Sequence, residues 1–212
     1  MRIHTHSERE RALTVAASAM RRGDLVVVPT ESMYAIATDA FSARGTSALR
    51  ALKHTAAGVG LPVMVPSPTT LAGIATGVLG PTHDLVEAFW PGPLTLVVNA
   101  QPTLMWDIGE RSRVSVRMPI HPFMLALLAV TGPAVVTGAN LPGMEALRDP
   151  EACEEQLEDH VSVILDAGTL SAQMPASTVV DVTGETPVLL RHGGYSLEEI
   201  RAVCPDVVDG TR

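Results

Sequence analysis

The feature that most constrains the fold is an uninterrupted apolar run, LVVV at residues 25–28, which Pro29 ends. A short run without polar alternation is typical of a strand that is covered on both faces. Before it, Ser7 and Glu10 form a capping-box pattern, which predicts a helix that continues to about Arg22. A helix followed directly by a buried strand indicates a layered α/β architecture.

The same alternation continues along the chain. Residues after Pro29 are expected to form a loop, and so is the segment 141–150. Further strands are predicted at 62–65, 94–99, 114–117, 134–137, 161–165, 178–182 and 188–190, and further helices at 43–54, 82–89, 123–130 and 197–203, the last capped by Ser196. Because several of the last strands have no helix between them, the sheet should mix parallel and antiparallel pairs. We predict a single α/β domain over residues 1–212, with its core at about 7–204.

The composition limits the classes of partner. A net charge of −8 repels polyanions, and an aromatic content of 3% leaves few surfaces on which bases could stack. Direct RNA binding is therefore not expected. The first residues are polar, the longest apolar run, at 123–130, is too short to cross a bilayer, and Cys153 and Cys204 lie far apart. These features predict a soluble cytoplasmic protein without a disulfide framework.

Several familiar sites are missing from the sequence. It contains no Walker loop, no complete G-x-G-x-x-G turn, no G-x-S-x-G elbow and no H-E-x-x-H pair. His4 and His6 are close in sequence, but they lie on a polar terminus where solvation is expected. We therefore predict neither covalent catalysis nor a metal site formed by protein side chains.

Four segments with polar side chains each follow an apolar strand, which is where open α/β sheets usually bind their ligands. The first, PTESMYAIA at 29–37, follows the buried strand. Taken alone, it is more typical of a strand-ending turn with Tyr34 packed on the core. Its functional interpretation depends on what surrounds it.

The segment resembles the Pro-Thr-Asp/Glu-Thr-x-Tyr-Gly-Leu motif of the YrdC-like threonylcarbamoyl-AMP synthase family. PTE at 29–31 and Tyr34 match this motif, and Ser32 replaces a threonine while keeping a hydroxyl. Further matches follow in the family's order: FWPGPLTLV at 89–97, VRMP at 116–119, TGANLPG at 137–143, and STVVDVTG with the following LLR at 177–191. The resemblance covers nearly the whole chain.

The resemblance implies a YrdC/RibB-like fold, in which a twisted mixed sheet flanked by helices surrounds a concave site with a positive wall. It also implies L-threonylcarbamoyladenylate synthase activity. The amine of L-threonine takes up bicarbonate, and the carbamate attacks the α-phosphorus of ATP, releasing pyrophosphate. Mg²⁺ is expected with ATP, and the product would pass to a separate tRNA threonylcarbamoyl transferase for t6A modification. Such a reaction rests on positioning and on charge neutralisation.

The resemblance also implies roles for particular residues. Arg117, on the polar face of its strand, is similar to the arginine near the threonine carboxylate, and a guanidinium suits a carboxylate. Its alternative is a surface strand charge. Hydroxyls for the amino acid or the carbamate would come from Thr30, Tyr34, Thr137, Ser177 and Thr178, each of which could instead only cap a turn. Lys53, Asn140 and Arg191 resemble the residues that contact the nucleotide.

Two positions depart from the family pattern on the nucleotide side. Thr55 stands where a Lys-x-Arg cluster would place its arginine, and Gly138 replaces the serine of a Ser-x-Asn signature. Each change removes a donor for phosphate oxygens. The alternative function is therefore a weakened paralogue that binds a nucleotide or small acid without turnover.

Overall fold

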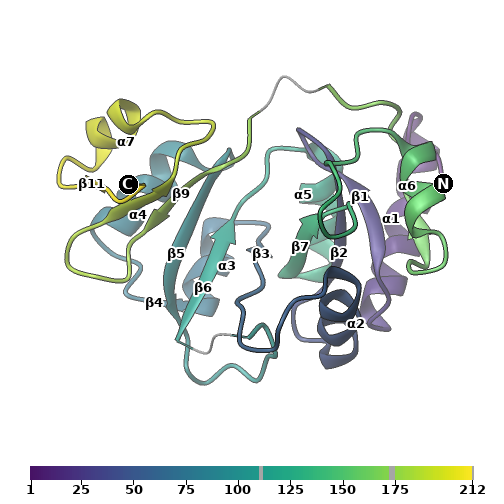
Figure 1. Cartoon of the computed structure of the whole chain (residues 1–212), viewed down its shortest axis with the longest axis horizontal. Helices are drawn as coiled ribbons and strands as arrows, with labels where there is room; N and C mark the ends of the chain where they lie inside the picture. Colours follow the sequence, from purple (N-terminus) through teal and green to yellow (C-terminus); the bar gives the residue numbers. More distant parts are fainter. Residues whose placement is uncertain (110–111, 172–174, 212) are drawn as a thin grey trace.

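The computed structural model of the protein describes residues 1–109, 112–171 and 175–211. The strands in these ranges are β1 (Val26–Pro29), β2 (Tyr34–Asp39), β3 (Val63–Met64), β4 (Ala75–Thr76), β5 (Leu94–Ala100), β6 (Arg113–Arg117), β7 (Ala134–Gly138), β8 (Val163–Ile164), β9 (Thr178–Asp181), β10 (Val188–Arg191) and β11 (Val208–Asp209). They form one sheet in the order β11-β10-β9-β5-β6-β3-β7-β2-β1-β8, with β4 beside β5 (Figure 1). β5 is parallel to β9 and antiparallel to β6, so the predicted mixed sheet is confirmed.

Helices pack on both faces of this sheet. They are α1 (His6–Arg21), α2 (Ala43–Lys53), α3 (Pro68–Ile74), α4 (Pro81–Phe89), α5 (Pro122–Thr131), α6 (Pro150–Leu157) and α7 (Leu197–Val203). One core cluster joins α1 and α5 to the sheet, and a second, larger cluster joins the other helices to it. Among the helices of the described ranges, none combines the length and apolar character needed to span a membrane.

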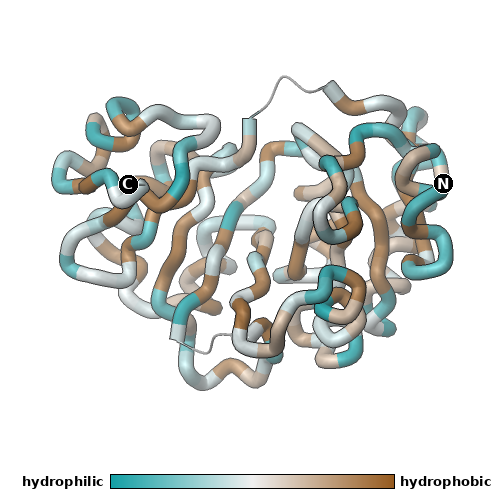
Figure 2. Tube along the Cα trace, viewed as in Figure 1, coloured by the Kyte–Doolittle hydropathy of each residue, from teal (hydrophilic) through white to brown (hydrophobic). Residues whose placement is uncertain are grey.

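The apolar run at 25–28 is buried on both sides, as the sequence predicts. Val26 and Val28 belong to the cluster beneath α1 and α5, whereas Val27 belongs to the cluster on the other face. All four residues of β1 are buried. Strands in the middle of the molecule are largely hydrophobic, and hydrophilic residues concentrate in the peripheral helices and turns (Figure 2).

The start of the first helix differs from the prediction by two residues. Thr5 is the N-cap, its hydroxyl accepts from the Glu8 amide, and the Glu8 carboxylate accepts from the Thr5 amide in return. Ser7 lies inside the first turn, so its pairing with Glu10 as a capping box was wrong. Thr5 with Glu8 and Ser7 with Glu10 both satisfy the capping-box sequence pattern. The N-cap is Thr5 because its backbone is extended, whereas Ser7 is already helical.

The expected loop after Pro29 covers only residues 30–33, because the chain turns back as β2 and pairs with β1 in an antiparallel hairpin. The prediction missed this strand since its residues, YAIATD, are buried on both faces and show no polar alternation. The helices α3 and α6 were also missed. Both are short and start at a proline in the first turn, and Pro150 was assigned to the preceding loop.

Candidate functional site

A cavity of about 400 Å³ lies on the sheet, lined from β2, β3, β5, β6, β7, β9 and β10 and from the turn after β1. Strand alternation explains which side chains reach it. On β5, Thr95 lies between two core leucines, and on β6, Ser115 and Arg117 alternate with core valines. The polar lining comprises Thr30, Ser32, Thr95, Ser115, Arg117, Thr137, Ser177 and Arg191. No aspartate or glutamate of the described residues lines this cavity, so its charged lining is positive.

Arg117 supplies the most buried of these cations. Its side chain is only 13% exposed, Nε donates to the Gly92 carbonyl at 2.9 Å, and Nη2 donates to the Glu31 carboxylate. Burial lowers the pKa of Arg117, and the Glu31 carboxylate counteracts this effect. The structure therefore places Arg117 in the cavity wall, fixed along one edge of its guanidinium group.

Arg191 lies on the wall formed by the end of β10. Its Nε and Nη2 donate to the Ser177 carbonyl at 3.0 and 2.9 Å, and Nη2 also donates to the Ser177 hydroxyl at 2.9 Å. That hydroxyl in turn lies 2.8 Å from the Thr95 hydroxyl, which the sequence reasoning did not select. The positive charge of Arg191 also lowers the pKa of Arg117, so the two cations act on each other. Thr95 could have been found from its place between two apolar residues in PLTLV.

Besides Ser177, two of the predicted hydroxyl residues, Thr30 and Thr137, line the same cavity. Thr30 donates from its hydroxyl to the Met33 carbonyl at 2.6 Å, which closes the turn between β1 and β2. The Thr137 hydroxyl is buried and has no hydrogen-bond partner in the described part of the chain. A buried hydroxyl without a partner is costly, so Thr137 is the more informative of the two.

Tyr34 and Thr178 do not line the cavity. Tyr34 is fully buried, donates to the Gly168 carbonyl at 2.8 Å and accepts from the Ala167 amide at 2.9 Å. The Thr178 hydroxyl donates to the Tyr195 carbonyl at 2.7 Å and accepts from the Tyr195 amide at 2.9 Å. Both hydroxyls thus form hydrogen bonds with the backbone of neighbouring loops. Neither residue lines the cavity in which a substrate contact was predicted.

The predicted nucleotide residues form a second cluster at the end of β7. The Lys53 ammonium donates to the carbonyls of Gly138 and Asn140 at 3.1 and 2.5 Å, and lies 3.4 Å from the Asn140 side-chain oxygen. Burial lowers the pKa of Lys53. Gly138 also lines the cavity, so this Lys53–Asn140 cluster adjoins the cavity, although neither side chain lines it.

The two departures from the family pattern have local consequences. A Cβ at Gly138 would lie 2.7 Å from the Asn140 side-chain oxygen, so the glycine gives this amide its room. The Thr55 hydroxyl makes a long contact of 3.4 Å with the Lys53 carbonyl, and the Thr55 amide donates to the Arg50 carbonyl at 2.9 Å. Beyond it, the buried Arg50 donates to the carbonyls of Ala56 and Val59 at 2.8 and 2.9 Å, which holds the loop after α2 from inside. The sequence reasoning did not single out Arg50.

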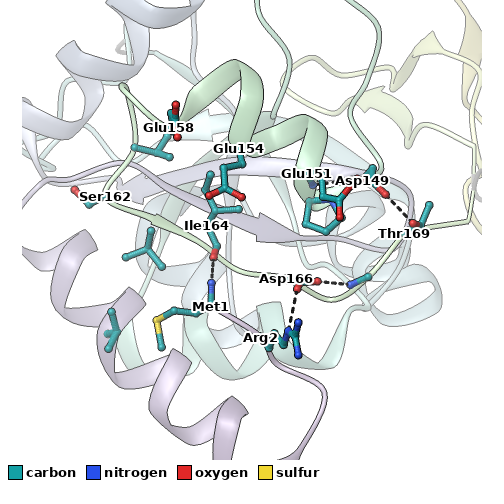
Figure 3. Close-up of a pocket in the computed structure, with 15 residues that line it drawn as sticks. Met1, Arg2, Asp149, Glu151, Glu154, Glu158, Ser162, Ile164, Asp166 and Thr169 are labelled. Atoms are coloured by element: carbon teal, nitrogen blue, oxygen red, sulfur yellow. Dashed lines mark hydrogen bonds and ion pairs between the residues drawn. The ribbon is translucent and has the colours of Figure 1, made fainter.

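A larger cavity, of about 810 Å³, lies beside α6 and the N-terminal residues (Figure 3). None of the predicted site residues lines it. Its charged lining is mainly acidic, with Asp149, Glu151, Glu154, Glu158 and Asp166. Such a lining repels a carboxylate or a phosphate, so the smaller, positive cavity is the candidate site. No group of three or more potential metal-ligating side chains occurs within residues 1–109, 112–171 and 175–211.

Comparisons with known proteins identify the family of the chain. The Sua5/YciO/YrdC family model, described as telomere recombination, matches residues 18–193. The chain belongs to this family. A Mycobacterium tuberculosis relative with the provisional name threonylcarbamoyl-AMP synthase is 41% identical over 197 residues, which are 92% of this chain and 90% of the relative. The threonylcarbamoyl-AMP synthase of Pyrococcus abyssi is 32% identical over 92% of this chain and 58% of its own length.

Solved structures of the family confirm the predicted fold. The Pyrococcus abyssi Sua5 protein complexed with L-threonine has a TM-score of 0.88 and 30% identity, and the match covers 99% of this chain and 61% of that one. The Escherichia coli YciO structure has a TM-score of 0.80 and 26% identity over 90% of this chain and 93% of its own. The chain thus spans about three fifths of the Pyrococcus protein but nearly all of the YciO protein. The predicted membership of the threonylcarbamoyl-AMP synthase family is confirmed.

Proposed function

We propose that the protein is an L-threonylcarbamoyladenylate synthase that uses the positive cavity to bind L-threonine and the phosphates of ATP. The observation that carries this proposal is the placement of Arg117 and Arg191 on one cavity, in a chain that aligns over nearly its full length with the threonine-bound Sua5 structure. A guanidinium pairs well with a carboxylate or a phosphate. The cavity also provides the Thr30 and Ser177 hydroxyls.

The reaction needs no covalent intermediate with the protein. The threonine amine adds to bicarbonate with loss of water, and a carbamate oxygen then attacks the α-phosphorus of ATP. The new carbon–oxygen–phosphorus link forms as the bond to the β-phosphate oxygen breaks, and pyrophosphate leaves. Arg117 would hold the amino-acid carboxylate, and Arg191 would neutralise charge on the phosphates, so the protein contributes orientation and electrostatic stabilisation.

Mg²⁺ would enter with ATP. The described lining of the cavity contains guanidinium groups and hydroxyls but no carboxylate to hold a divalent cation by itself. A cation coordinated by the phosphates would offset their charge and leave the protein groups to bind the remaining oxygens. The product would then pass to a separate tRNA threonylcarbamoyl transferase for t6A modification.

Pyrophosphate release tests this function. Purified protein with L-threonine, bicarbonate, ATP and Mg²⁺ should release pyrophosphate and form threonylcarbamoyl-AMP, and omission of threonine or of bicarbonate should abolish both signals. Release that does not depend on threonine would indicate a simple nucleotide hydrolase and would contradict the proposal.

A second candidate function, binding without turnover, is favoured by the Lys53–Asn140 cluster. There the ammonium is already bound by carbonyl oxygens, Gly138 has no side-chain donor, and the Thr55 hydroxyl contacts the Lys53 carbonyl. Under this alternative, calorimetry would detect binding of threonine or a nucleotide while the pyrophosphate assay stays at background.

A further inference from the structure

Glu31 contacts Arg117 across the sheet. It lies in the turn between β1 and β2, whereas Arg117 ends β6, and the sheet order places β3 and β7 between β6 and β2. Residues of β3 and β7, such as Met64 and Val136, line the cavity. The ion pair therefore ties the turn to the far side of the cavity floor.

The two partners of this ion pair are exposed to different surroundings. Arg117 lines the cavity, but Glu31, whose side chain is 8% exposed, does not. The second Glu31 oxygen, Oε2, is buried without a hydrogen-bond partner among the described residues. Glu31 thus contacts the guanidinium group from outside the cavity lining, where it can fix Arg117 without itself lining the site.

Arg117 is the cation that forms an ion pair with the Glu31 carboxylate. His121 is close enough for the Glu31 carboxylate to act on it, yet burial lowers the His121 pKa, so its imidazole is neutral near pH 7. The His121 Nδ1 atom is itself buried and unpartnered in the described part of the chain. The carboxylate and the guanidinium consequently hold each other in place, and the Gly92 carbonyl accepts from Nε on the same edge of the guanidinium group.

We propose that Glu31 is the positioning residue that orients Arg117 toward the carboxylate of the amino-acid substrate, an inference that rests on the proposed function of the cavity. The Arg117 side chain has several rotatable bonds, and the nearby positive charge of Arg191 repels it. The Glu31 carboxylate opposes that repulsion and restricts the guanidinium to one orientation. Substrate then binds a group that is already in place.

The test compares steady-state constants of Glu31→Gln with those of the unmodified protein. Glutamine keeps the size of the side chain but loses the charge, so the KM for threonine should rise about tenfold, as expected for one charged hydrogen bond, while the KM for ATP changes less than twofold. Glu31→Asp keeps the charge with a shorter reach and should show an intermediate rise. An unchanged or lower KM for threonine in both variants, or an equal rise for both substrates, would overturn the proposal.

Two controls separate positioning from a general loss of structure. Asp24 is also a poorly exposed ion-pair carboxylate, bound to Arg22 and Arg44 and remote from the cavity, so Asp24→Asn should leave both KM values unchanged. In an Arg117→Gln background, Glu31→Gln should add less than about twofold to the loss of kcat/KM, because the two residues act as a unit. Additive losses, or a threonine defect in Asp24→Asn, would overturn the inference.

The outcome stays distinct from that of the proposed function. Absence of pyrophosphate release from the unmodified protein would contradict the synthase alone. In that case threonine binding measured by calorimetry tests the inference directly. Weaker binding by Glu31→Gln than by the unmodified protein would support the role of Glu31 in orienting Arg117, and equal binding would contradict it.

Discussion

The cavity wall with Arg117 and Arg191 and the Lys53–Asn140 cluster both contain basic side chains, but they use them differently. In the wall, each guanidinium is fixed through Nε and Nη2, and no protein acceptor is assigned to Nη1 of either side chain within the described ranges. In the cluster, the single ammonium contacts three oxygens of the chain itself. The comparison teaches that a basic residue kept at its family position does not always have N–H donors available for a substrate, because the chain itself can occupy them.

This difference has a geometric cause. A guanidinium has five N–H donors in a planar fork, so it can be anchored on one edge and still present another. An ammonium has three donors at one point. The carbonyl oxygens of Gly138 and Asn140 accept from Lys53 Nζ, and the Asn140 side-chain oxygen lies 3.4 Å from it. The cavity wall thus keeps guanidinium donors for a ligand, whereas the Lys53–Asn140 cluster uses its ammonium on the chain itself.

The largest effect is expected on replacing Arg117. Arg117→Gln should lower kcat/KM for threonine by about 100-fold or more, since it removes a charged partner of the substrate carboxylate. The same change leaves Glu31 buried without a counter-ion and should lower the free energy of unfolding by about 3 kcal/mol. Steady-state kinetics and denaturant unfolding measure the two effects. Retained threonine dependence would show that the wall is not the amino-acid side.

Lys53→Met should have a smaller effect, and mainly on stability. It removes three contacts of a half-buried ammonium and should lower the free energy of unfolding by about 2 kcal/mol. The exposed Arg44, which pairs with Asp24 at the surface, is a suitable control, because Arg44→Met should cost less than about 0.5 kcal/mol. If Lys53→Met instead keeps full stability and raises only the KM for ATP, the ammonium serves the nucleotide and the contrast between the two regions fails.

Adding a cation at position 55 tests the same comparison by giving the Lys53–Asn140 cluster a basic group with free donors. Thr55→Arg should lower the KM for ATP about tenfold, because a guanidinium beside Lys53 would have donors that the local carbonyls do not consume. Threonine binding should stay the same. Thr76→Arg, at an exposed position of β4 that does not line the cavity, controls for a general change in charge. No response to Thr55→Arg would mean that the nucleotide does not approach this loop.

The smallest effect near neutral pH concerns two groups outside both regions. Burial raises the pKa of the Tyr34 hydroxyl to about 12 and that of the Cys153 thiol to about 12. Since the folded pKa values exceed the ordinary values of 10.0 and 9.0, their contribution to stability is complete below pH 9 and is lost as the pH rises toward 12. Unfolding measured between pH 7 and 11 should show a flat region and then a decline, and Cys153 should resist alkylation until the protein unfolds.

The sequence predicted much of the fold because strong local signals agreed with it. The apolar run at 25–28, the alternation around Ser115 and the capping serine at 196 all correspond to observed elements. It failed where the local signal was ambiguous. β2 lacks polar alternation because both of its faces are buried, and two overlapping capping-box patterns compete at the first helix.

For the site, the sequence by itself determined the family, the residue types and the two departures at Thr55 and Gly138. Only the tertiary structure decided which of those residues share a cavity, because Arg117, Ser177 and Arg191 are brought together by strands far apart in the chain. It also decided that the hydroxyls of Tyr34 and Thr178 donate to loop carbonyls, and that Glu31 pairs with Arg117 from outside the cavity lining. Hydrogen-bond partners depend on long-range packing, and a motif specifies a residue without specifying which of its donors remain free.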